Sequence, residues 1–352
     1  MLKKAIAVFL ALALMASLLA GCGNGAAQTG DTGTKAPEAS GEKIVMKIAH
    51  AAKPGSARDQ GAVRIKEVVE RETNGKVEVQ LYPASQLGGG KDLIEGMQMS
   101  TIEMVILPSS FLGGFAPLTT IMDLPFFFPD DYKKMMELEA GPAGQKLKET
   151  TEAIGVKTLD IWHTGYKGFS AQTPLRKPAD FKGLKFRVMP SPIQIAQYEV
   201  MGATPINMEF SECYNALQSG AIDGQENPID TTYDMKFHEV QKTFTISRHG
   251  VLDQFIMVSK DWFEKLPEDI RAAILKGVEE GRQVAIEKTH ETEEIGLAAF
   301  KEKGLEIVEL TAEERAAFID ATKSVKDTYV SKYGAEAEAL LKLFEDEMAK
   351  LK

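Results

Sequence analysis

The sequence predicts a two-lobed α/β protein with mixed sheets and one long helix that spans both lobes. Short alternating apolar runs are separated by amphipathic helical stretches, an order typical of α/β sheets. About 310 residues follow the first 42, enough for a sizeable core, and that length favours two lobes over one. A helical pattern of about 37 residues runs from Pro267 to Lys303. At 1.5 Å per residue it would reach about 55 Å, longer than a small lobe is wide.

The first lobe is expected to contain a mainly parallel sheet, because its elements follow a β-α-β-α-β order. The expected elements are a strand at 43–50, a helix at 58–73, a strand within GKVEVQLYP, a helix at about 91–99 after the glycine-rich turn QLGGG, a strand at 103–107, a helix near 131–152 and a strand at 156–163.

The second lobe begins near residue 165. Its expected elements are a strand at 184–188, helices at about 191–201 and 211–219, one strand or two within FTISRHGVLDQFIMVSK, and closing helices at about 311–332 and 335–351. We therefore assign 43–164 plus 253–292 to lobe I and 165–252 plus 293–352 to lobe II. The strands near 160–165 and 250–256 are the expected crossings between the lobes.

The N-terminus predicts export. Lys3 and Lys4 precede an apolar run that ends in the sequence Leu-Ala-Gly-Cys, too short and wrongly flanked for a spanning helix. This ending resembles the lipobox of bacterial lipoproteins, in which the cysteine becomes the lipidated first residue. Residues 1–22 are therefore interpreted as a lipoprotein signal peptide ending at Cys22. The small, polar residues 23–42 are expected to form a flexible tether.

The composition argues against a disulfide-stabilised protein and against a nucleic-acid-binding protein. One cysteine, Cys213, remains beyond Cys22, so stability must come from the core and not from an intrachain disulfide. Without Lys3 and Lys4, 39 basic side chains face 51 acidic ones, a net charge of −12, and no basic stripe suggests nucleic-acid binding. An anionic ligand would therefore need local positive groups.

No catalytic motif is present. The five histidines are scattered, HExxH, CxxC and GxSxG are absent, and GGGKD lacks the spacing of a phosphate-binding loop. His50, at the end of the first expected strand, is interpreted as structural. We therefore expect neither an enzyme nor a metal or cofactor site, with an extracytoplasmic hydrolase as a weak alternative.

The strand GLKFRVMP at 183–190 carries the most informative charge. Leu184, Phe186 and Val188 alternate with Lys185 and Arg187, which predicts a half-buried strand. The alternation alone leaves open whether Arg187 faces solvent or a cleft inside the protein.

Three segments of the second lobe together resemble one family. They are GYKGFSAQTPLRKPADFKGLKFRV at 165–188, MGATPINMEFSECYNALQSGAIDGQENP at 201–228 and HGVLDQFIMVSK at 249–260. They are similar to the substrate-binding proteins of tripartite ATP-independent periplasmic (TRAP) transporters. YPASQLGGG at 82–90 and DLPFFF at 123–128 agree with that family, so the resemblance covers 43 to about 340.

The resemblance implies a periplasmic-binding-protein-like fold and a set of ligand contacts. The family's central arginine, which pairs bidentately with a substrate carboxylate, corresponds to Arg187, and its fork geometry suits that role. A second family cation corresponds to Lys167, where many members have arginine. Asn227 corresponds to an asparagine that contacts the acid, and Phe210 to an apolar wall.

The first lobe offers further candidates on geometry alone. Ser109 and Ser110 follow an apolar strand, and loops at the carboxyl ends of α/β strands line crevices. The alternatives are structural: loop capping for the two serines, a surface position for Lys167, a turn for Asn227 and core packing for Phe210.

The resemblance further implies a receptor that binds an organic acid, best a C4-dicarboxylate, and delivers it to the membrane subunits of a TRAP permease. Receptors for sugar acids or for aromatic or keto acids are the alternatives within this class. A co-receptor for a membrane sensor kinase is an alternative from another class. The expected location is extracytoplasmic, with a lipid anchor in the membrane at Cys22.

Overall fold

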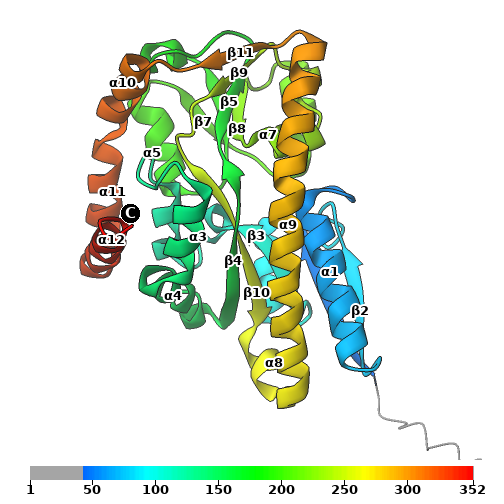
Figure 1. Cartoon of the computed structure of the whole chain (residues 1–352). Coiled ribbons are helices and arrows are strands. Elements are labelled where there is room, and N and C mark those ends of the chain that lie inside the picture. The colour runs from blue at the N-terminus through cyan, green and yellow to red at the C-terminus, as the bar shows by residue number, and fades with distance from the viewer. Residues whose placement is uncertain (1–42, 352) are drawn as a thin grey trace, which may run out of the picture. The chain divides into compact units, whose positions relative to one another are not determined.

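The computed structural model describes residues 43–351, so the predicted signal peptide, the tether and Cys22 lie outside the described residues. Two separate β-sheets organise this part of the chain, one of five strands and one of six. Figure 1 shows one sheet in the upper part of the molecule and the other in the lower part, each with helices on its flanks. The predicted two-lobed α/β fold with mixed sheets is thus confirmed.

The first sheet forms the centre of lobe I. Its strands, in sheet order, are β2 (Val77–Tyr82), β1 (Ile44–His50), β3 (Met104–Pro108), β10 (Val251–Ser259) and β4 (Val156–Tyr166). The pairs β1–β2 and β1–β3 are parallel, as the β-α-β-α-β order predicts, whereas β10 is antiparallel to both β3 and β4. All nine residues of β10 are buried, as expected for a strand covered on both faces.

The second sheet forms the centre of lobe II. Its strands, in sheet order, are β11 (Glu306–Glu309), β9 (Thr243–Ile246), β5 (Gly168–Ala171), β8 (Gly224–Asn227), β6 (Lys185–Val188) and β7 (Thr204–Asn207). Arg187 lies on β6, which is enclosed between β8 and β7 and is not an edge strand. Of the four residues of β6, only Lys185 is exposed.

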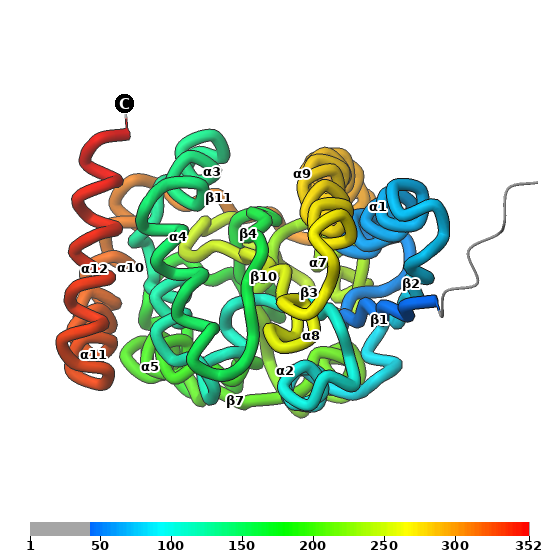
Figure 2. Tube along the Cα trace, turned by 90° about the horizontal axis from the view of Figure 1, so that it is seen from below, coloured from blue at the N-terminus to red at the C-terminus, as the bar shows by residue number. Residues whose placement is uncertain are grey.

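The helices flank the sheets (Figure 2). They are α1 (Ala57–Glu72), α2 (Gly90–Gln98), α3 (Tyr132–Ala140), α4 (Pro142–Glu149), α5 (Pro192–Val200), α6 (Cys213–Ser219), α7 (Ile229–Asp234), α8 (Lys260–Lys265), α9 (Glu268–Lys303), α10 (Ala312–Thr322), α11 (Ser324–Tyr333) and α12 (Ala335–Met348). Two short 3-10 helices of lobe I, η1 (Ser109–Leu112) and η2 (Pro117–Asp123), follow β3.

Three of the sequence expectations need correction or completion. The single helix expected at about 311–332 is wrong: it is two helices, α10 and α11, with a turn at Lys323 between them. The single helix expected near 131–152 is wrong: it is two helices, α3 and α4, because Gly141 and Pro142 end one and begin the next. The run FTISRHGVLDQFIMVSK, left open as one strand or two, is two strands, β9 in the second sheet and β10 in the first.

The long helix is confirmed as α9, 36 residues from Glu268 to Lys303. It packs along α1 of lobe I and along α7 of lobe II, and Figure 1 shows it running along both lobes. None of the helices within 43–351 combines the length and the apolar character that crossing a membrane requires.

Of the last two helices, α12 packs on lobe I, and α11 contacts both η2 of lobe I and α5 of lobe II. Tyr329 of α11 and Phe344 of α12 belong to the same hydrophobic cluster as Leu147 of α4 and Met122 of η2. In contrast, Phe318 of α10 belongs to the cluster of lobe II. The chain therefore returns to the first lobe after α10.

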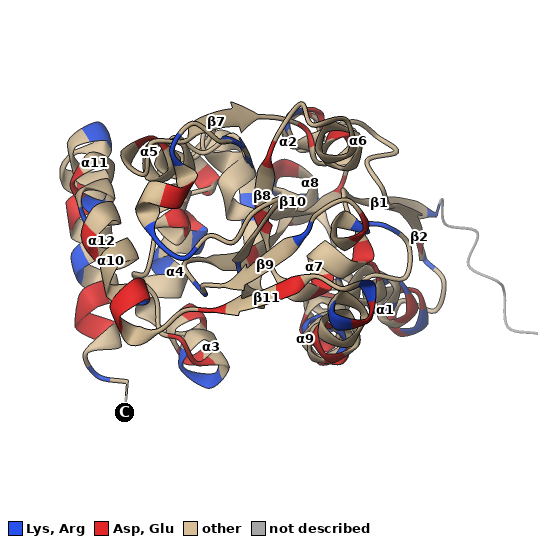
Figure 3. Ribbon diagram, turned by 90° about the horizontal axis from the view of Figure 1, so that it is seen from above, with Lys and Arg blue, Asp and Glu red and all other residues tan. Residues whose placement is uncertain are grey.

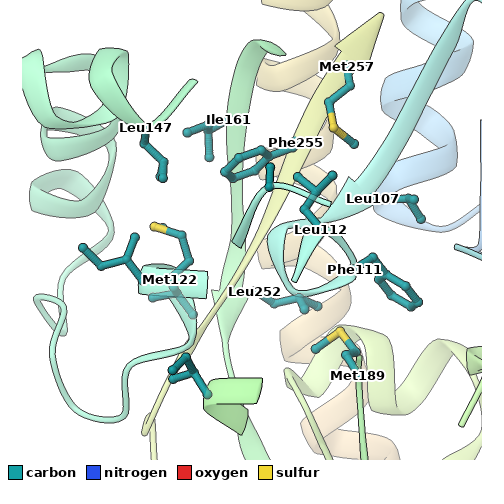
Figure 4. Packing of buried hydrophobic residues seen from close by; sticks show 14 of the residues in the cluster. Leu107, Phe111, Leu112, Met122, Leu147, Ile161, Met189, Leu252, Phe255 and Met257 are labelled. Carbon is teal, nitrogen blue, oxygen red and sulfur yellow. The ribbon is translucent and has the colours of Figure 1, made fainter. Parts of the chain in front are cut away.

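The largest cluster also joins the two lobes. Figure 4 shows Met189, which follows β6, close to Phe111 of η1, with Leu252 of β10 nearby. These three side chains are buried, so the lobes are in contact across an apolar junction beside the strands β4 and β10.

Candidate functional site

A cavity that contains Arg187 lies between the lobes. Its empty volume is about 260 Å³. Lobe I contributes Ala51, Arg58, Pro108 and Phe111 to its wall, and lobe II contributes Arg187, Met189, Phe210 and Asn227. Leu252, on β10 where the chain crosses between the lobes, completes the wall. Among these nine lining residues the two arginines are the only ionisable ones, and they come from opposite lobes.

Arg187 is held in a fixed orientation. Its Nε and Nη2 both donate to the carbonyl oxygen of Met208, at 3.2 and 3.1 Å, because Met208 follows β7, the strand beside β6. The guanidinium lies 5.5 Å from the ring centroid of Phe210. A guanidinium has five N–H donors, so three remain for a ligand. Burial lowers the pKa of Arg187, which stays cationic at neutral pH.

Asn227 and Phe210 complete the side of lobe II. The Asn227 amide donates to Oε1 of Gln225 and keeps its carbonyl oxygen and a second N–H. Phe210 is 6% exposed and packs against Phe237 in its own small cluster. Phe210 is therefore both a core residue and part of the cavity wall, and its contact with a ligand stays a prediction.

Arg58 is the site residue that the sequence interpretation missed. It lies in the first turn of α1, which Ser56 caps by accepting from the backbone N–H of Asp59. Within residues 43–351, its guanidinium has neither a salt bridge nor a hydrogen bond, although the residue is only 7% exposed. Burial lowers the pKa of Arg58 to about 10, and the charges of Asp230 and Asp234 oppose that shift.

A signal for Arg58 was present in the sequence. Arg58, Ala62, Ile65 and Val69 follow the helical period, and all four are buried on one face of α1. An arginine at the start of an otherwise apolar stripe indicates a buried cation, and a buried cation needs an anionic partner.

Lys167 lies outside the lining of this cavity. It connects β4 to β5, and its Nζ contacts Oε1 of Glu226 at 3.0 Å and Oδ1 of Asp123 at 3.4 Å. Burial alone would lower the pKa of Lys167, but the two carboxylates raise it above the ordinary lysine value. Its charge is therefore compensated by the protein itself.

The carboxylate of Glu226 is the centre of this buried network. Burial would raise the pKa of Glu226, but Lys167 and His249 hold it far below the ordinary value. His249 Nε2 lies 2.8 Å from Oε2 of Glu226, and Tyr198 donates to the same oxygen at 2.7 Å. The Lys167 network thus consists of Lys167, Glu226, Asp123, His249 and Tyr198.

The two predicted serines lie near this network and not at the cavity. Ser110 donates to Oδ1 of Asp123 at 2.6 Å and accepts from Gln194 at 3.0 Å. The backbone oxygen of Ser109 accepts from Thr119. Their neighbours Pro108 and Phe111 are the residues that line the cavity.

A further buried group consists of Glu139, His163 and Asp253, whose donor atoms lie within 4.8 Å of one another. His163 Nδ1 lies 2.6 Å from Oδ1 of Asp253. Burial, together with Asp253, raises the pKa of Glu139 well above its ordinary value, so a proton on Glu139 relieves the repulsion between the carboxylates. These donor types also bind divalent metals, and the expectation of no metal stays a prediction.

The positive charge at the cavity is local. Figure 3 shows basic and acidic residues interspersed over the helices and strands. An anion between Arg58 and Arg187 would therefore be held by those two groups and not by a general positive field.

Comparison with known proteins shows the family of the chain. Residues 48–332 match the model of "Bacterial extracellular solute-binding protein, family 7". The chain belongs to this family. It is therefore an extracytoplasmic solute receptor of the TRAP type, as the sequence motifs predict.

Three similar proteins illustrate the family. The C4-dicarboxylate-binding periplasmic protein DctP of Rhodobacter capsulatus is 39% identical over 306 residues, 86% of this chain and 91% of that protein. A TRAP periplasmic solute-binding protein from Desulfovibrio salexigens, solved with bound orotic acid, has a TM-score of 0.85 and 36% identity, covering 88% of this chain and 100% of the other. One from Shewanella oneidensis, with bound succinate, has a TM-score of 0.82 and 32% identity, at 88% and 100% coverage.

Proposed function

We propose that this receptor binds a C4-dicarboxylate in the cavity between its lobes and delivers it to the membrane subunits of a TRAP permease. The observation that carries the proposal is the pair of cavity-lining arginines, Arg187 and Arg58, which come from opposite lobes. Two separated cations match the two ends of a short dicarboxylate.

Four of the nine lining residues have distinct roles in this proposal. Arg187, whose orientation is fixed by Met208, pairs with one carboxylate through its remaining N–H groups. Arg58, which has no partner of its own among residues 43–351, pairs with the other carboxylate. Asn227 donates to or accepts from the first carboxylate, and Phe210 packs against the carbon chain.

Lys167 acts indirectly in this proposal. Its ammonium keeps Glu226 ionised and contacts Asp123 where lobe I and lobe II meet, and Ser110 donates to Asp123 in the same place. The network supports the closed arrangement of the lobes, while the arginines bind the ligand.

The binding cycle follows from the two lobes. We propose that lobe I comprises 43–164 plus 253–292 and that lobe II comprises 165–252 plus 293 to about 322. We further propose that α12 travels with lobe I, on which it packs, and that α11 connects the two lobes. A ligand that bridges Arg187 and Arg58 favours the closed state, because it contacts both arginines only there.

The membrane attachment is proposed from the sequence. Cleavage before Cys22 and lipidation of its thiol would anchor the protein outside the cytoplasmic membrane, and residues 23–42 would link the anchor to the domain.

A second candidate function is an aromatic monocarboxylate receptor. The D. salexigens protein with bound orotic acid, 36% identical to this chain, favours it. In that case Arg187 would bind the single carboxylate and Phe210 would pack against the ring, which leaves Arg58 without an anionic partner.

Calorimetry on the mature domain tests the proposal. Succinate is titrated into the wild type and the Arg187→Ala, Arg58→Ala and Arg176→Ala variants, with benzoate and orotate as monocarboxylates. Loss of Arg187 should weaken succinate binding about 100-fold or more, because a buried carboxylate loses its partner. Arg58→Ala should weaken succinate more than the monocarboxylates. Arg176, about half exposed and outside the cavity lining, is the matched control and should have no effect.

Two outcomes would contradict the proposal. Tight orotate binding without succinate binding would favour the aromatic acid. Unchanged succinate affinity in Arg187→Ala would show that this cavity is not the binding site.

A further inference from the structure

A second cavity, somewhat larger than the first, adjoins the proposed dicarboxylate site. Arg58 and Phe210 belong to the walls of both cavities, so the two are neighbours. The second cavity, of about 330 Å³ empty volume, also has Thr164, Asp230, Thr231 and Asp234 in its wall. A group attached to a ligand held by Arg58 would therefore extend toward Asp230.

Asp230 has an unused acceptor there. The residue lies at the start of α7 and is 4% exposed. Its Oδ1 is buried and has no hydrogen-bond partner within the described part of the chain. A buried acceptor without a partner is unfavourable, so a donor is expected at this oxygen in the working protein.

Charged groups from several elements face Asp230. Glu293 of α9 and Asp234 of α7 repel its negative charge, and Arg58 of α1 attracts it. Tyr132 of α3 is also within its electrostatic range. Lys53, before α1, pairs with Asp234 at 3.1 Å and not with Asp230.

Both protonation states of Asp230 are accessible near neutral pH. Burial, assisted by Glu293, raises the pKa of Asp230 to about 7, while Arg58 opposes the rise. The ionised form repels a nearby ligand carboxylate and accepts strongly from a hydroxyl. A carboxylate bound at Arg58 would therefore avoid Asp230, whereas a hydroxyl beside it would fit.

We propose that Oδ1 of Asp230 is a hydroxyl subsite that makes this receptor select 2-hydroxy-dicarboxylates over unsubstituted dicarboxylates of the same length. This inference rests on the proposed function, because the carboxylates must first be held by Arg187 and Arg58. The ligand hydroxyl donates to Asp230, which gives the buried acceptor the partner it lacks. A methylene group at the same place leaves the acceptor unpaired.

The test compares succinate with the two enantiomers of malate. In the wild type, the better malate enantiomer should bind at least about 10-fold more tightly than succinate. In Asp230→Leu, which is similar in size but has no acceptor, this ratio should fall to about twofold or less. Asp230→Asn keeps an acceptor oxygen and should retain part of the preference. Asp320→Asn, at a position 77% exposed on α10, is the control and should keep the full ratio.

A measurement on the wild type alone provides an independent check should Asp230→Leu fail to fold. Succinate affinity should rise as the pH falls from 8 to 6, because protonation of Asp230 removes its repulsion of the bound dianion. Malate affinity should change less, because the ionised form is the better acceptor for its hydroxyl. Equal pH dependence for the two ligands would overturn the proposal.

The two proposals fail differently. If neither succinate nor malate binds, the proposed dicarboxylate function is wrong. If both bind with equal affinity and both depend on Arg187, only the hydroxyl subsite is wrong. A malate preference that persists in Asp230→Leu would also overturn the subsite.

Discussion

Arg187 and Lys167 are both buried cations near the junction of the lobes, and their surroundings differ. Arg187 donates two N–H groups to the backbone carbonyl of Met208 and lines a cavity. Lys167 contacts two protein carboxylates. In the proposed function, the charge of Arg187 pairs with a ligand, whereas the charge of Lys167 is neutralised by the protein itself. Substitutions should therefore affect affinity at the first residue and stability at the second.

The largest effect is expected for Lys167→Met. Removing the ammonium leaves Glu226 and Asp123 buried with one cation fewer, which should lower the free energy of unfolding by about 3–5 kcal/mol. Chemical denaturation of the ligand-free domain measures this loss. A variant of native stability that binds ligand as weakly as Arg187→Ala would overturn the comparison and return Lys167 to the ligand site.

Arg187→Lys should act mainly on binding. Lysine keeps the charge but not the fork, so succinate affinity should fall about 10- to 100-fold, or about 1–3 kcal/mol. Calorimetry gives this value, and thermal unfolding of the ligand-free variant shows whether the fold is intact. An affinity equal to the wild type would mean that a point charge suffices.

Asp230→Asn tests an uncompensated negative charge. The folded pKa of Asp230, about 7, exceeds the unfolded value, so the wild type loses stability as the pH rises from about 4 to 7. Asparagine does not titrate. The variant should therefore be more stable than the wild type at pH 8, by about 1–3 kcal/mol, with a smaller gain at pH 5. Urea denaturation at both pH values provides the comparison, and a gain that does not depend on pH would contradict it.

The smallest effect is expected for Lys53→Met. Lys53 pairs with Asp234 across the lobes, but 41% of its side chain is exposed. Solvent screens such a pair, so the loss should stay below about 1 kcal/mol, in contrast to Lys167. Denaturation in low and high salt would show whether even that contribution is electrostatic.

Much of the fold could be predicted from the sequence, because its longer elements repeat their pattern several times. The helix α9, the strands β1 and β2 and the helix α1 lie within a residue or two of their expected bounds. The four-residue strands β5, β7, β8 and β11 were missed, because four residues carry too little periodicity. The break between α3 and α4 was readable in Gly141-Pro142, which the helical pattern around it obscured.

The candidate site was only partly predictable. The motifs around Arg187, Asn227 and Phe210 indicated three residues that line one cavity. The partners of Lys167 are Asp123 and Glu226, 44 and 59 residues away in the chain, and no local pattern reveals such pairing. Arg58 was overlooked because a polar residue in a first helical turn is usually exposed, although it lies on the buried stripe of α1.

The long helix α9 limits how the lobes can move. Its packing on α1 is tight: a methyl group added at Gly281 would lie 2.8 Å from the carbonyl oxygen of Gly61. Farther along, Gly296 lies against Ile229 and Tyr233 of α7. A rigid rod fixed at both places would prevent any separation of the lobes, so opening requires α9 to bend or its contact with α7 to slide. The elastic energy of that deformation then contributes to the ligand affinity. Residues far from the cavity set this contribution.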